Sequence, residues 1–429
     1  MLHGSKSSLT GSDISTIRTR SDAMTAIKNK HMRRVLIIVE NLPVPFDRRV
    51  WSEATTLRDA GYGVSVICPT GRGFEAKEET IDGINIYRHS LPLEARGASA
   101  YLIEYSAAIF WEFVLSLKVA RRHGFDVIHA CNPPDLIFLV ALIFKLFGNK
   151  GFLFDQHDAN PEFFESKFDR RGLFWKLLLL AERLTFKFAD VSIATNESYR
   201  RIAIERGRMP PDRVFVVRSG PDIERVKAYP ADSTWRNGRK YMVGYLGVIS
   251  QSEGLDLLLE SIDYIVRKQG RSDIQFVLVG GGPEWQAIKE LCEKMNLQDF
   301  VTLPGRVDDK TLFTILSTAD VCVNPDRVTT MNDISTMNKI MEYMALAKPI
   351  VQFDVTEGRY SAQEASLYAK ANDPVNFADK VLKLLADPNA RIRMSQIGHK
   401  RVHDQLAWHH EQPKLLQAYD KLFEVCRKP

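Results

Sequence analysis

Apolar and polar positions along this chain follow two alternating patterns. Runs of about four to six apolar residues, such as 35–39 and 274–279, are typical of strands buried on both faces of a parallel sheet. Between them lie longer segments with apolar positions three or four residues apart, as in 47–60, which predict amphipathic helices. The alternation predicts an α/β fold with helices on both faces of a parallel sheet.

The predicted elements fall into two series. The strands are expected at 35–39, 64–68, 126–129, 152–155, 191–194, 214–217, 241–245, 274–279, 301–303, 321–323 and 350–353. The helices are expected near 47–60, 100–122, 134–147, 171–188, 197–205, 254–268, 284–295, 309–318, 336–346, 375–387, 389–403 and 407–426. A stretch rich in Pro, Gly and Asn at 219–240 interrupts the alternation, which favours a linker there.

Two doubly wound, Rossmann-like domains follow from this division. We expect an N-terminal domain over 33–220, a linker over 221–240, a C-terminal domain over 241–405 and a final helix over 406–429. Residues 1–32 lack the apolar core of a secretory signal and are predicted to be disordered. We expect this tail to be an expression or start-site artefact, with a transit peptide as the alternative.

Charge and cysteine content narrow the function classes. The chain of 429 residues has a formal charge of +5, and residues 1–34 carry all of that excess. The body is formally neutral, so no nucleic-acid partner is predicted. Five separated cysteines and no apolar run of about 20 residues favour a cytoplasmic protein without a disulfide framework or a membrane span.

The absence of several sequence motifs excludes other classes. The chain has no P-loop, no G-x-G-x-x-G after a strand, no G-x-S-x-G and no H-E-x-x-H. It also has no D-x-D pair, so we expect no metal site of that spacing. Backbone amides and cationic side chains are left to bind phosphate.

Two segments of the C-terminal half fit anion binding. Gly280, Gly281 and Gly282, followed by Pro283 and Glu284, end a strand and open a helix, where the backbone can approach a phosphate. Such turns also occur for packing reasons alone.

The second of these segments is the start of the helix predicted at 336–346. Ser335 or Thr336 is expected to cap it, so that Asn338 and Lys339 face an anion while Glu342 receives ribose hydroxyls. An ordinary surface ion pair between Lys339 and Glu342 is the alternative.

The N-terminal half offers a histidine and an arginine pair. His157 follows a predicted strand, at the edge where sites form in parallel sheets, although a structural histidine bonded to Asp155 or Asp158 is the alternative. Arg48 and Arg49 open the first helix and could clamp a phosphate or simply be solvated.

Seven stretches together resemble the retaining family 4 glycosyltransferases of GT-B fold, and more narrowly a bacterial subgroup from exopolysaccharide and O-antigen clusters. They are PFDRRVW (45–51), DVIH (126–129), FDQHD (154–158), VRSGPD (217–222), GGGPE (280–284), NKIMEYMA (338–345) and KP (348–349). The resemblance implies two domains facing across a cleft, with the last helix crossing back onto the N-terminal domain.

The resemblance also implies roles for individual residues. His157 would contact the donor sugar and Lys339 the leaving diphosphate, as the catalytic pair. The remaining donor-binding residues would be Gly247, Gly281, Gly282, Pro283, Glu284, Arg306, Asp333, Ser335, Thr336, Met337, Asn338 and Glu342. The acceptor side would include Phe46, Asp47, Arg48, Arg49, Asn132 and Asp158.

The chain departs from the family at three positions. Val248 and Glu253 stand where the family usually has Arg and Lys, and Ile334 replaces the first of its two spaced glutamates. We expect Lys339 and Arg306 to take over the phosphate charge and Asp333 to stand in for the lost glutamate.

The function implied is transfer of a sugar from a nucleotide diphosphate sugar, UDP- or GDP-linked, to a glycan or polyprenyl-diphosphate-linked acceptor. No metal and no further cofactor are expected. A nucleotide-sugar epimerase and a non-catalytic donor-binding scaffold are the alternatives. The helices expected at 100–122 and 171–188 could contact the cytoplasmic face of the inner membrane peripherally. The alternative is that their apolar residues face the core, because helices that cover a parallel sheet are also apolar.

Overall fold

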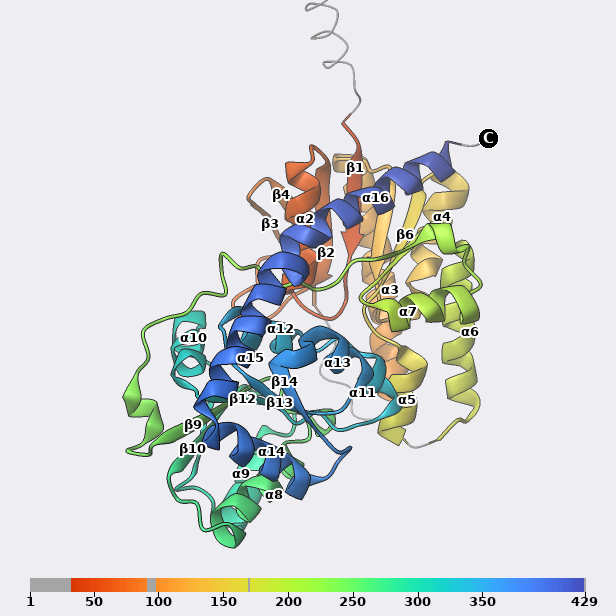
Figure 1. Ribbon diagram of the computed structural model, residues 1–429. Coiled ribbons are helices and arrows are strands. Elements are labelled where there is room, and N and C mark those ends of the chain that lie inside the picture. The colour runs from red at the N-terminus through yellow and green to blue at the C-terminus, as the bar shows by residue number, and fades with distance from the viewer. Residues whose placement is uncertain (1–31, 91–97, 169, 428–429) are drawn as a thin grey trace, which may run out of the picture.

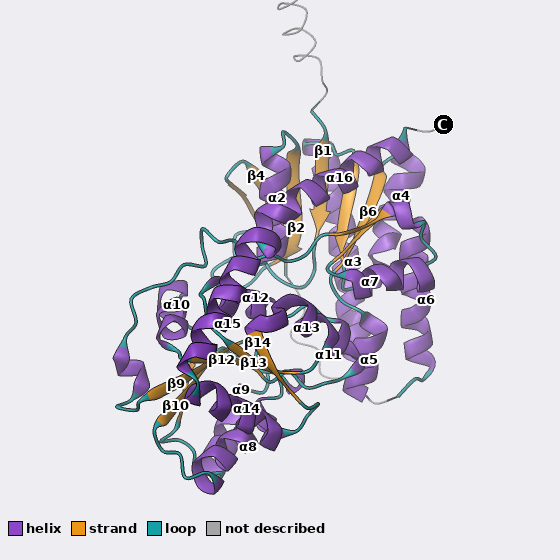
Figure 2. Cartoon of the chain, in the orientation of Figure 1, coloured by secondary structure: helices purple, strands orange, loops and turns teal. Residues whose placement is uncertain are grey.

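The computed structural model describes residues 32–90, 98–168 and 170–427, which form two α/β bodies (Figures 1 and 2). Each body is built on one sheet. The first has eight strands in the order β3-β4-β2-β1-β5-β6-β7-β8, and the second has six in the order β11-β10-β9-β12-β13-β14. All neighbouring strands in the two sheets are parallel apart from the β3–β4 hairpin. The predicted doubly wound, two-domain α/β class is confirmed.

The first body contains the elements up to residue 216. Its strands are β1 (Arg34–Ile38), β2 (Gly63–Pro69), β3 (Glu78–Ile81), β4 (Ile84–His89), β5 (Val127–Cys131), β6 (Gly151–Gln156), β7 (Val191–Ala194) and β8 (Val214–Val216). Its helices are α2 (Arg48–Asp59), α3 (Ala98–Arg122), α4 (Phe138–Gly148), α5 (Asn160–Phe168), α6 (Leu173–Phe188) and α7 (Glu197–Arg201). The central strands β5 and β6 are buried throughout, as their apolar runs predict.

The second body contains the remaining strands and most of the remaining helices. Its strands are β9 (Tyr241–Leu246), β10 (Ile274–Val279), β11 (Val301–Gly305), β12 (Val321–Asn324), β13 (Ile350–Phe353) and β14 (Ser366–Ala369). Its helices are α8 (Leu255–Asp263), α9 (Trp285–Lys294), α10 (Asp309–Thr318), α11 (Thr330–Ile334), α12 (Asn338–Ala345), α13 (Thr356–Ala362), α14 (Pro374–Ala386) and α15 (Pro388–Arg401).

The final helix, α16 (Trp408–Cys426), crosses from the second body back onto the first (Figure 1). The Trp408 ring N–H donates to Thr56 Oγ1 at 3.0 Å, and the Tyr419 hydroxyl lies 2.9 Å from His129 Nδ1. Leu415 and Leu422 are buried in the apolar core of the first body. The crossing implied by the family resemblance is therefore confirmed.

Some short elements were not predicted from the pattern. Strands β3 and β4 are joined by Asp82 and Gly83, both at positive φ, a turn that suits a tight hairpin. Helices α5 and α13 and strand β14 were also missed. Residues 1–31 of the predicted tail lie outside the described part of the chain. Within the described part, no helix is both long enough and apolar enough to cross a membrane.

Candidate active site

A cleft between the two bodies is lined by several of the residues singled out by the sequence. One cavity in it, with a volume of about 350 Å³, is lined from both sides. Its walls include Phe46, Arg48 and Arg49 of the first body and Asn338 and Glu342 of the second. Three predicted acceptor-side residues and two predicted donor-binding residues therefore face a common space.

The first-body wall is built around Arg49, whose side chain is 7% exposed. We call Arg49, Glu53, His129, Cys131, Asp155 and His157 the Arg49 cluster. The guanidinium Nη2 lies 2.8 Å from Asp155 Oδ1 and 3.1 Å from Glu53 Oε1. Nη1 donates to Val217 O at 2.8 Å and to Ser219 Oγ at 3.2 Å. The donors of Arg49 therefore all face acceptors of the protein, so Arg49 has no N–H to spare for a phosphate.

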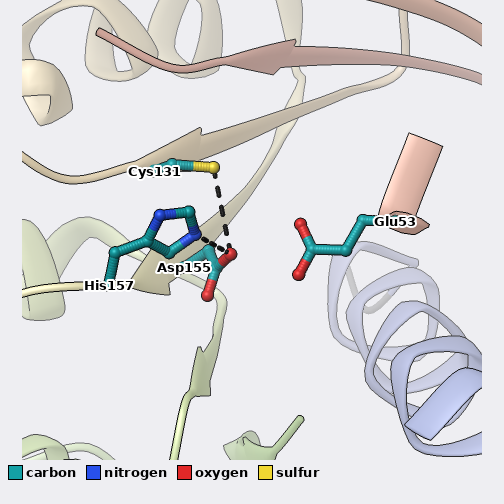
Figure 3. Close-up of side chains that lie close together, drawn as sticks. All are labelled: Glu53, Cys131, Asp155 and His157. Carbon is teal, nitrogen blue, oxygen red and sulfur yellow. Dashed lines mark hydrogen bonds and ion pairs between the residues drawn. The ribbon is translucent and has the colours of Figure 1, made fainter. Parts of the chain in front are cut away.

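His157 is held by the same cluster. Its Nε2 lies 2.5 Å from Asp155 Oδ2 and 3.1 Å from Arg49 Nε. Figure 3 shows the imidazole edge directed at Asp155, with Glu53 on the opposite side of that carboxylate. Burial raises the pKa of Asp155, but Arg49 and His157 outweigh it and hold that pKa well below its usual range. Asp155 is thus an anion that fixes the ring of His157.

Glu53 behaves differently from Asp155. Its carboxyl is fully buried, and burial raises its pKa well above the usual range despite the nearby Arg49. Ligand atoms of Glu53, Cys131, Asp155 and His157 lie within 4.8 Å of one another, as a metal site requires. The guanidinium of Arg49 already supplies the positive charge between these groups, so the residues present do not fit a metal ion.

Asn132 fixes the loop that carries His157. Its side-chain oxygen accepts from the backbone N–H groups of His157 at 2.7 Å and Asp158 at 3.1 Å. Asp47 caps α2 by accepting from Val50 N at 3.1 Å. Phe46, by contrast, is exposed at the cleft and contacts the ring of Phe74. Of these four predicted acceptor-side residues, Phe46 is the one with an exposed side chain.

The second-body wall centres on Lys339, whose side chain is 8% exposed. Its ammonium lies 2.7 Å from Asp326 Oδ1 and also contacts Glu253, while Tyr245 OH donates to Glu253 Oε2 at 2.6 Å. We call Tyr245, Glu253, Asp326 and Lys339 the Lys339 cluster. Burial lowers the pKa of Lys339, but the two carboxylates outweigh it and the pKa is raised. Lys339 therefore stays charged in the cleft wall.

Glu342 does not pair with Lys339 across the helix turn. Its Oε1 instead accepts from Arg225 Nη2 at 2.7 Å. Arg225 Nη1 also lies 3.0 Å from Asp309, and Arg48 reaches the same Asp309 carboxylate at 3.0 Å from the first body. The alternative of a surface pair between Lys339 and Glu342 is therefore wrong. Arg225 binds the Glu342 carboxylate, which was predicted to accept hydrogen bonds from ribose hydroxyls.

The segment before α12 is held differently from our expectation. Helix α12 begins at Asn338, with Met337 as its N-cap residue and no side-chain cap. The prediction that Ser335 or Thr336 caps this helix is therefore wrong. Thr336 Oγ1 instead accepts from Asn196 of the first body at 3.0 Å, and Ser335 Oγ lies 3.2 Å from Tyr199 OH. These two side chains join the predicted donor segment to the opposite body.

Asp333 binds the first residue of α13. Its Oδ1 accepts from Thr356 N at 2.8 Å and its Oδ2 from Thr356 Oγ1 at 3.0 Å. Both oxygens therefore hold α13.

The glycine turn after β10 packs closely on the loop after β9. A Cβ at Gly280, whose φ is +146°, would lie 1.8 Å from Gly247 O, and one at Gly282 would lie 2.5 Å from Ile249 O. A Cβ at Gly281 would meet the Arg306 side chain at 3.1 Å. Packing thus requires glycine at 280 and 282, whereas Pro283 and Glu284 are exposed at the start of α9.

Sequence reasoning missed the carboxylates that hold the cations. Glu253 was identified from the sequence only as the residue that replaces a lysine of the family. Asp326 and Arg225 were not identified at all. Asp326 follows β12 by two residues, so the rule that parallel strands deliver site residues at their carboxyl ends could have found it. Arg225 lies in the stretch treated as a linker, where the pattern gives no such signal.

Two family profiles match this chain. Residues 47–225 match the family profile described as Glycosyltransferase Family 4, and residues 240–387 match the one described as Glycosyl transferases group 1. The chain is 27% identical over 157 residues to alpha-D-kanosaminyltransferase of Streptomyces kanamyceticus, covering 36% of this chain and 39% of that protein.

A second relative is the GDP-mannose-dependent alpha-(1-6)-phosphatidylinositol monomannoside mannosyltransferase of Mycobacterium tuberculosis. It is 23% identical over 245 residues, which cover 54% of this chain and 63% of that protein. The chain thus spans about half the length of the curated relatives it matches.

Two solved structures share the whole fold. Sucrose-phosphate synthase from Thermosynechococcus elongatus superposes with a TM-score of 0.77 at 18% identity, over 92% of this chain and all of that one. Anabaena Alr3699/HepE, crystallised with UDP-glucose, gives a TM-score of 0.68 at 14% identity, over 91% and all of the two chains. With both bodies matched by family profiles and the whole fold by these structures, the chain belongs to the family 4 glycosyltransferases of GT-B fold.

Proposed function

We propose that this protein is a retaining glycosyltransferase that moves a sugar from a UDP- or GDP-sugar to a lipid-linked glycan in cell-surface polysaccharide synthesis. The observation that supports the proposal is the cavity that Arg48 and Arg49 line from the first body and Asn338 and Glu342 line from the second. The relatives named for GDP-mannose and the neighbour crystallised with UDP-glucose support the donor class.

Catalysis would rest on positioning and electrostatics. Lys339 and the N-terminus of α12 would stabilise the diphosphate as its bond to the anomeric carbon breaks. The acceptor oxygen would form the new bond on the same face of the sugar, and its proton would pass to the leaving phosphate oxygen. His157, fixed by Asp155, would orient the donor sugar. No metal ion is needed in this scheme, because the protein's own cations meet the charge.

Substitution of the donor-side residues tests the assignment. Lys339→Ala and Glu342→Ala should each lower the transfer rate at least tenfold, whereas Lys400→Ala on the exposed end of α15 should not change it. Near wild-type rates in both site variants would refute the assigned roles. Incubating the donor alone and looking for an epimer by NMR separates transfer from epimerisation.

A thermal-shift screen identifies the donor. UDP, GDP, ADP and TDP sugars are tested in turn, because a ligand at 100 times its dissociation constant adds about 2.7 kcal/mol of stability. A shift with one nucleotide that is lost in Glu342→Ala would support the donor site. Tight binding without turnover on any acceptor would favour a donor-binding scaffold instead.

Peripheral contact with the cytoplasmic face of the inner membrane is part of the proposal. Phe110 and Trp111 on α3 are exposed, in agreement with an interfacial role, whereas Phe113 and Trp175 are half-buried. Flotation with liposomes containing anionic phospholipid should carry the protein to the top of the gradient. Protein that stays at the bottom would remove the membrane from the proposed function.

A further inference from the structure

A basic pocket lies in the first body, at the end of α6. It has a volume of about 460 Å³, within the range of about 300–1,000 Å³ that is typical of small-molecule sites. None of its lining residues is acidic, and half of them are cationic, namely Arg183, Lys187, Arg206, Arg208 and Arg213. We call this cavity the Arg208 pocket.

The Arg208 pocket lies at the edge of the first sheet that is remote from the cleft. Arg183 and Lys187 are on α6, which leads into β7, whereas Arg208 and Arg213 precede β8. In Figure 1 the strand β1 runs toward the second body, and β7 and β8 belong to the same parallel part of the sheet. The pocket shares no lining residue with the cavity in the cleft.

The base of this pocket is firmly held. Arg206 Nη1 lies 2.5 Å from Glu162 Oε1, and Nη2 lies 2.6 Å from Glu182 Oε2, so this guanidinium is neutralised within the protein. Phe186 is buried, and a Cβ at Gly207 would lie 2.5 Å from its ring. Close packing therefore requires glycine at 207, which fixes the following turn against α6.

The other four cations of the pocket are not compensated by carboxylates. Within the described part of the chain, no ion pair forms with Arg183, Lys187, Arg208 or Arg213. Two carboxylates close to them in sequence bind other cations. Asp190 pairs with Lys145 at 2.6 Å. Asp212 pairs with Lys421 of α16 at 2.7 Å. Like charges at one cavity repel one another, and a bound anion relieves that repulsion.

The backbone at Arg208 is a further sign that the side chain matters. Its φ is +57°, in the left-handed region that favours glycine and asparagine. The turn itself therefore gives no reason for an arginine, and the side chain is exposed at the pocket. A guanidinium there offers planar, paired N–H donors that match phosphate oxygens.

The surroundings of the pocket favour a soluble ligand over a membrane surface. Phe186 and Met209 line the pocket but are buried. Among residues 181–228, all of which the structure describes, no large apolar side chain is exposed. A surface that inserts into lipid needs such side chains.

We propose that the Arg208 pocket binds a soluble compound that carries two or more phosphate groups, at a site separate from the cleft. The four uncompensated cations would supply the attraction, and bidentate contacts with the guanidinium groups would supply the geometry. A single phosphate would leave most of this charge uncompensated, so the affinity should rise with the number of phosphate groups. This inference does not rest on the proposed function, because none of these cations lines the cleft cavity.

Binding of inorganic triphosphate to the full chain tests the site. Titration calorimetry gives the Kd, and hydrogen exchange followed by mass spectrometry shows where the anion binds. We expect triphosphate to bind more tightly than orthophosphate and to slow exchange within 203–213. Equal affinities for the two anions, or unchanged exchange in that segment, would overturn the proposal.

Two variants and a matched control test the charges. Arg183→Gln removes a charge from α6, and Arg208→Asn removes one from the turn while keeping a residue that tolerates positive φ. Each should raise the Kd for triphosphate about tenfold, because hydrogen bonds between charged groups are the strong ones. Arg121→Gln, at an exposed arginine of α3 that forms no ion pair in the described chain, should leave the Kd unchanged. Unchanged affinity in both pocket variants would refute the site.

Two further measurements separate this pocket from other anion sites. Lys339→Ala removes a cation of the second-body wall and should leave the slowed exchange within 203–213 unchanged. If that effect of triphosphate disappears in Lys339→Ala, the anion binds in the cleft and the proposal is wrong. Vesicles of anionic phospholipid should not slow exchange within 203–213. Slowing by vesicles but not by triphosphate would assign the pocket to a lipid head group and overturn the soluble ligand.

Discussion

The two walls of the cleft hold their charges in opposite ways. In the Arg49 cluster one guanidinium is surrounded by Asp155, Glu53 and two oxygens of the segment after β8, so its charge is satisfied within the protein. In the second wall, Glu342 lines the cleft and is bound to Arg225, while the nearly buried Lys339 is bound to Glu253 and Asp326.

This difference separates residues that support the site from residues expected to bind the ligand. The first arrangement fixes the position of His157 and has no donor left over for a ligand. In the second arrangement, the groups expected to bind diphosphate and ribose are already engaged in ion pairs within the protein. A nucleotide sugar must break these ion pairs before it can make its own contacts. Cations kept close to carboxylates bind an anion less tightly than free cations would, since part of their attraction is already used.

The largest effect is expected from Asp155→Asn. Removing one partner of a buried ion pair leaves Arg49 uncompensated, which costs about 3–5 kcal/mol. The free energy of unfolding at pH 7, measured with urea, should fall by that amount, and transfer should fall with it as His157 loses its fixed position. An unchanged free energy would mean that the Arg49 cluster contributes little to the fold.

The pH dependence of this variant follows from the lowered pKa of Asp155. A carboxylate whose pKa is lowered by folding stabilises the protein above its unfolded pKa of about 3.9 and loses that contribution as the pH falls. The difference between wild type and Asp155→Asn should therefore narrow as the pH drops below about 4. A difference that stays constant down to the lowest pH tolerated would refute the charged state assigned to Asp155.

The next effect concerns Glu253, which stands where the family usually has lysine. Glu253→Gln removes a negative charge that contacts Lys339 and preserves the side-chain shape. We expect the Kd for the nucleotide diphosphate to fall about tenfold, or 1.4 kcal/mol, by titration calorimetry. Asp256→Asn in the first turn of α8, which removes a carboxylate paired with Arg327, is the matched control. Weaker binding in Glu253→Gln would show that Glu253 supports Lys339 as a ligand.

The sequence predicted the first wall better than the second. Helix 47–60 and the strand before His157 follow from apolar periodicity, and parallel strands deliver their next residues to a common edge. That rule is enough to place His157 and Arg49 near each other. Their link through Asp155 depends on side-chain directions, which periodicity does not give.

The second wall depends on contacts between distant loops. Lys339 meets Glu253 and Asp326, which lie 86 and 13 residues away, and nothing in the local pattern specifies that approach. The N-cap at 336 was predicted from residue type, but Thr336 instead bonds Asn196 across the cleft. Tertiary contacts thus overrode a local preference at the point where the two bodies meet.

A smaller effect is expected from Arg225→Gln. The pair of Arg225 with Glu342 is partly exposed, and such pairs contribute about 0.2–1 kcal/mol. Freeing Glu342 should lower the Kd for the nucleotide by up to about fivefold at low salt, with a smaller change at high salt. Arg48→Gln, which leaves the contact with Glu342 intact, should not change the Kd in this way. A weaker affinity in Arg225→Gln would mean that Arg225 itself contacts the ligand.

The smallest effect is expected from Glu53→Gln, the counterpart of Asp155→Asn in the same cluster. Burial raises the pKa of Glu53, so folding favours its protonated form, and an amide of equal shape should change the free energy of unfolding by about 1 kcal/mol or less at pH 5. A raised pKa stabilises the fold below the unfolded pKa of about 4.3 and loses that contribution as the pH rises. From pH 5 to 8 the variant should therefore gain stability relative to wild type in urea titrations. A loss of stability over that range would show that Glu53 is an anion paired with Arg49, and the cluster would then hold two charged carboxylates around one guanidinium.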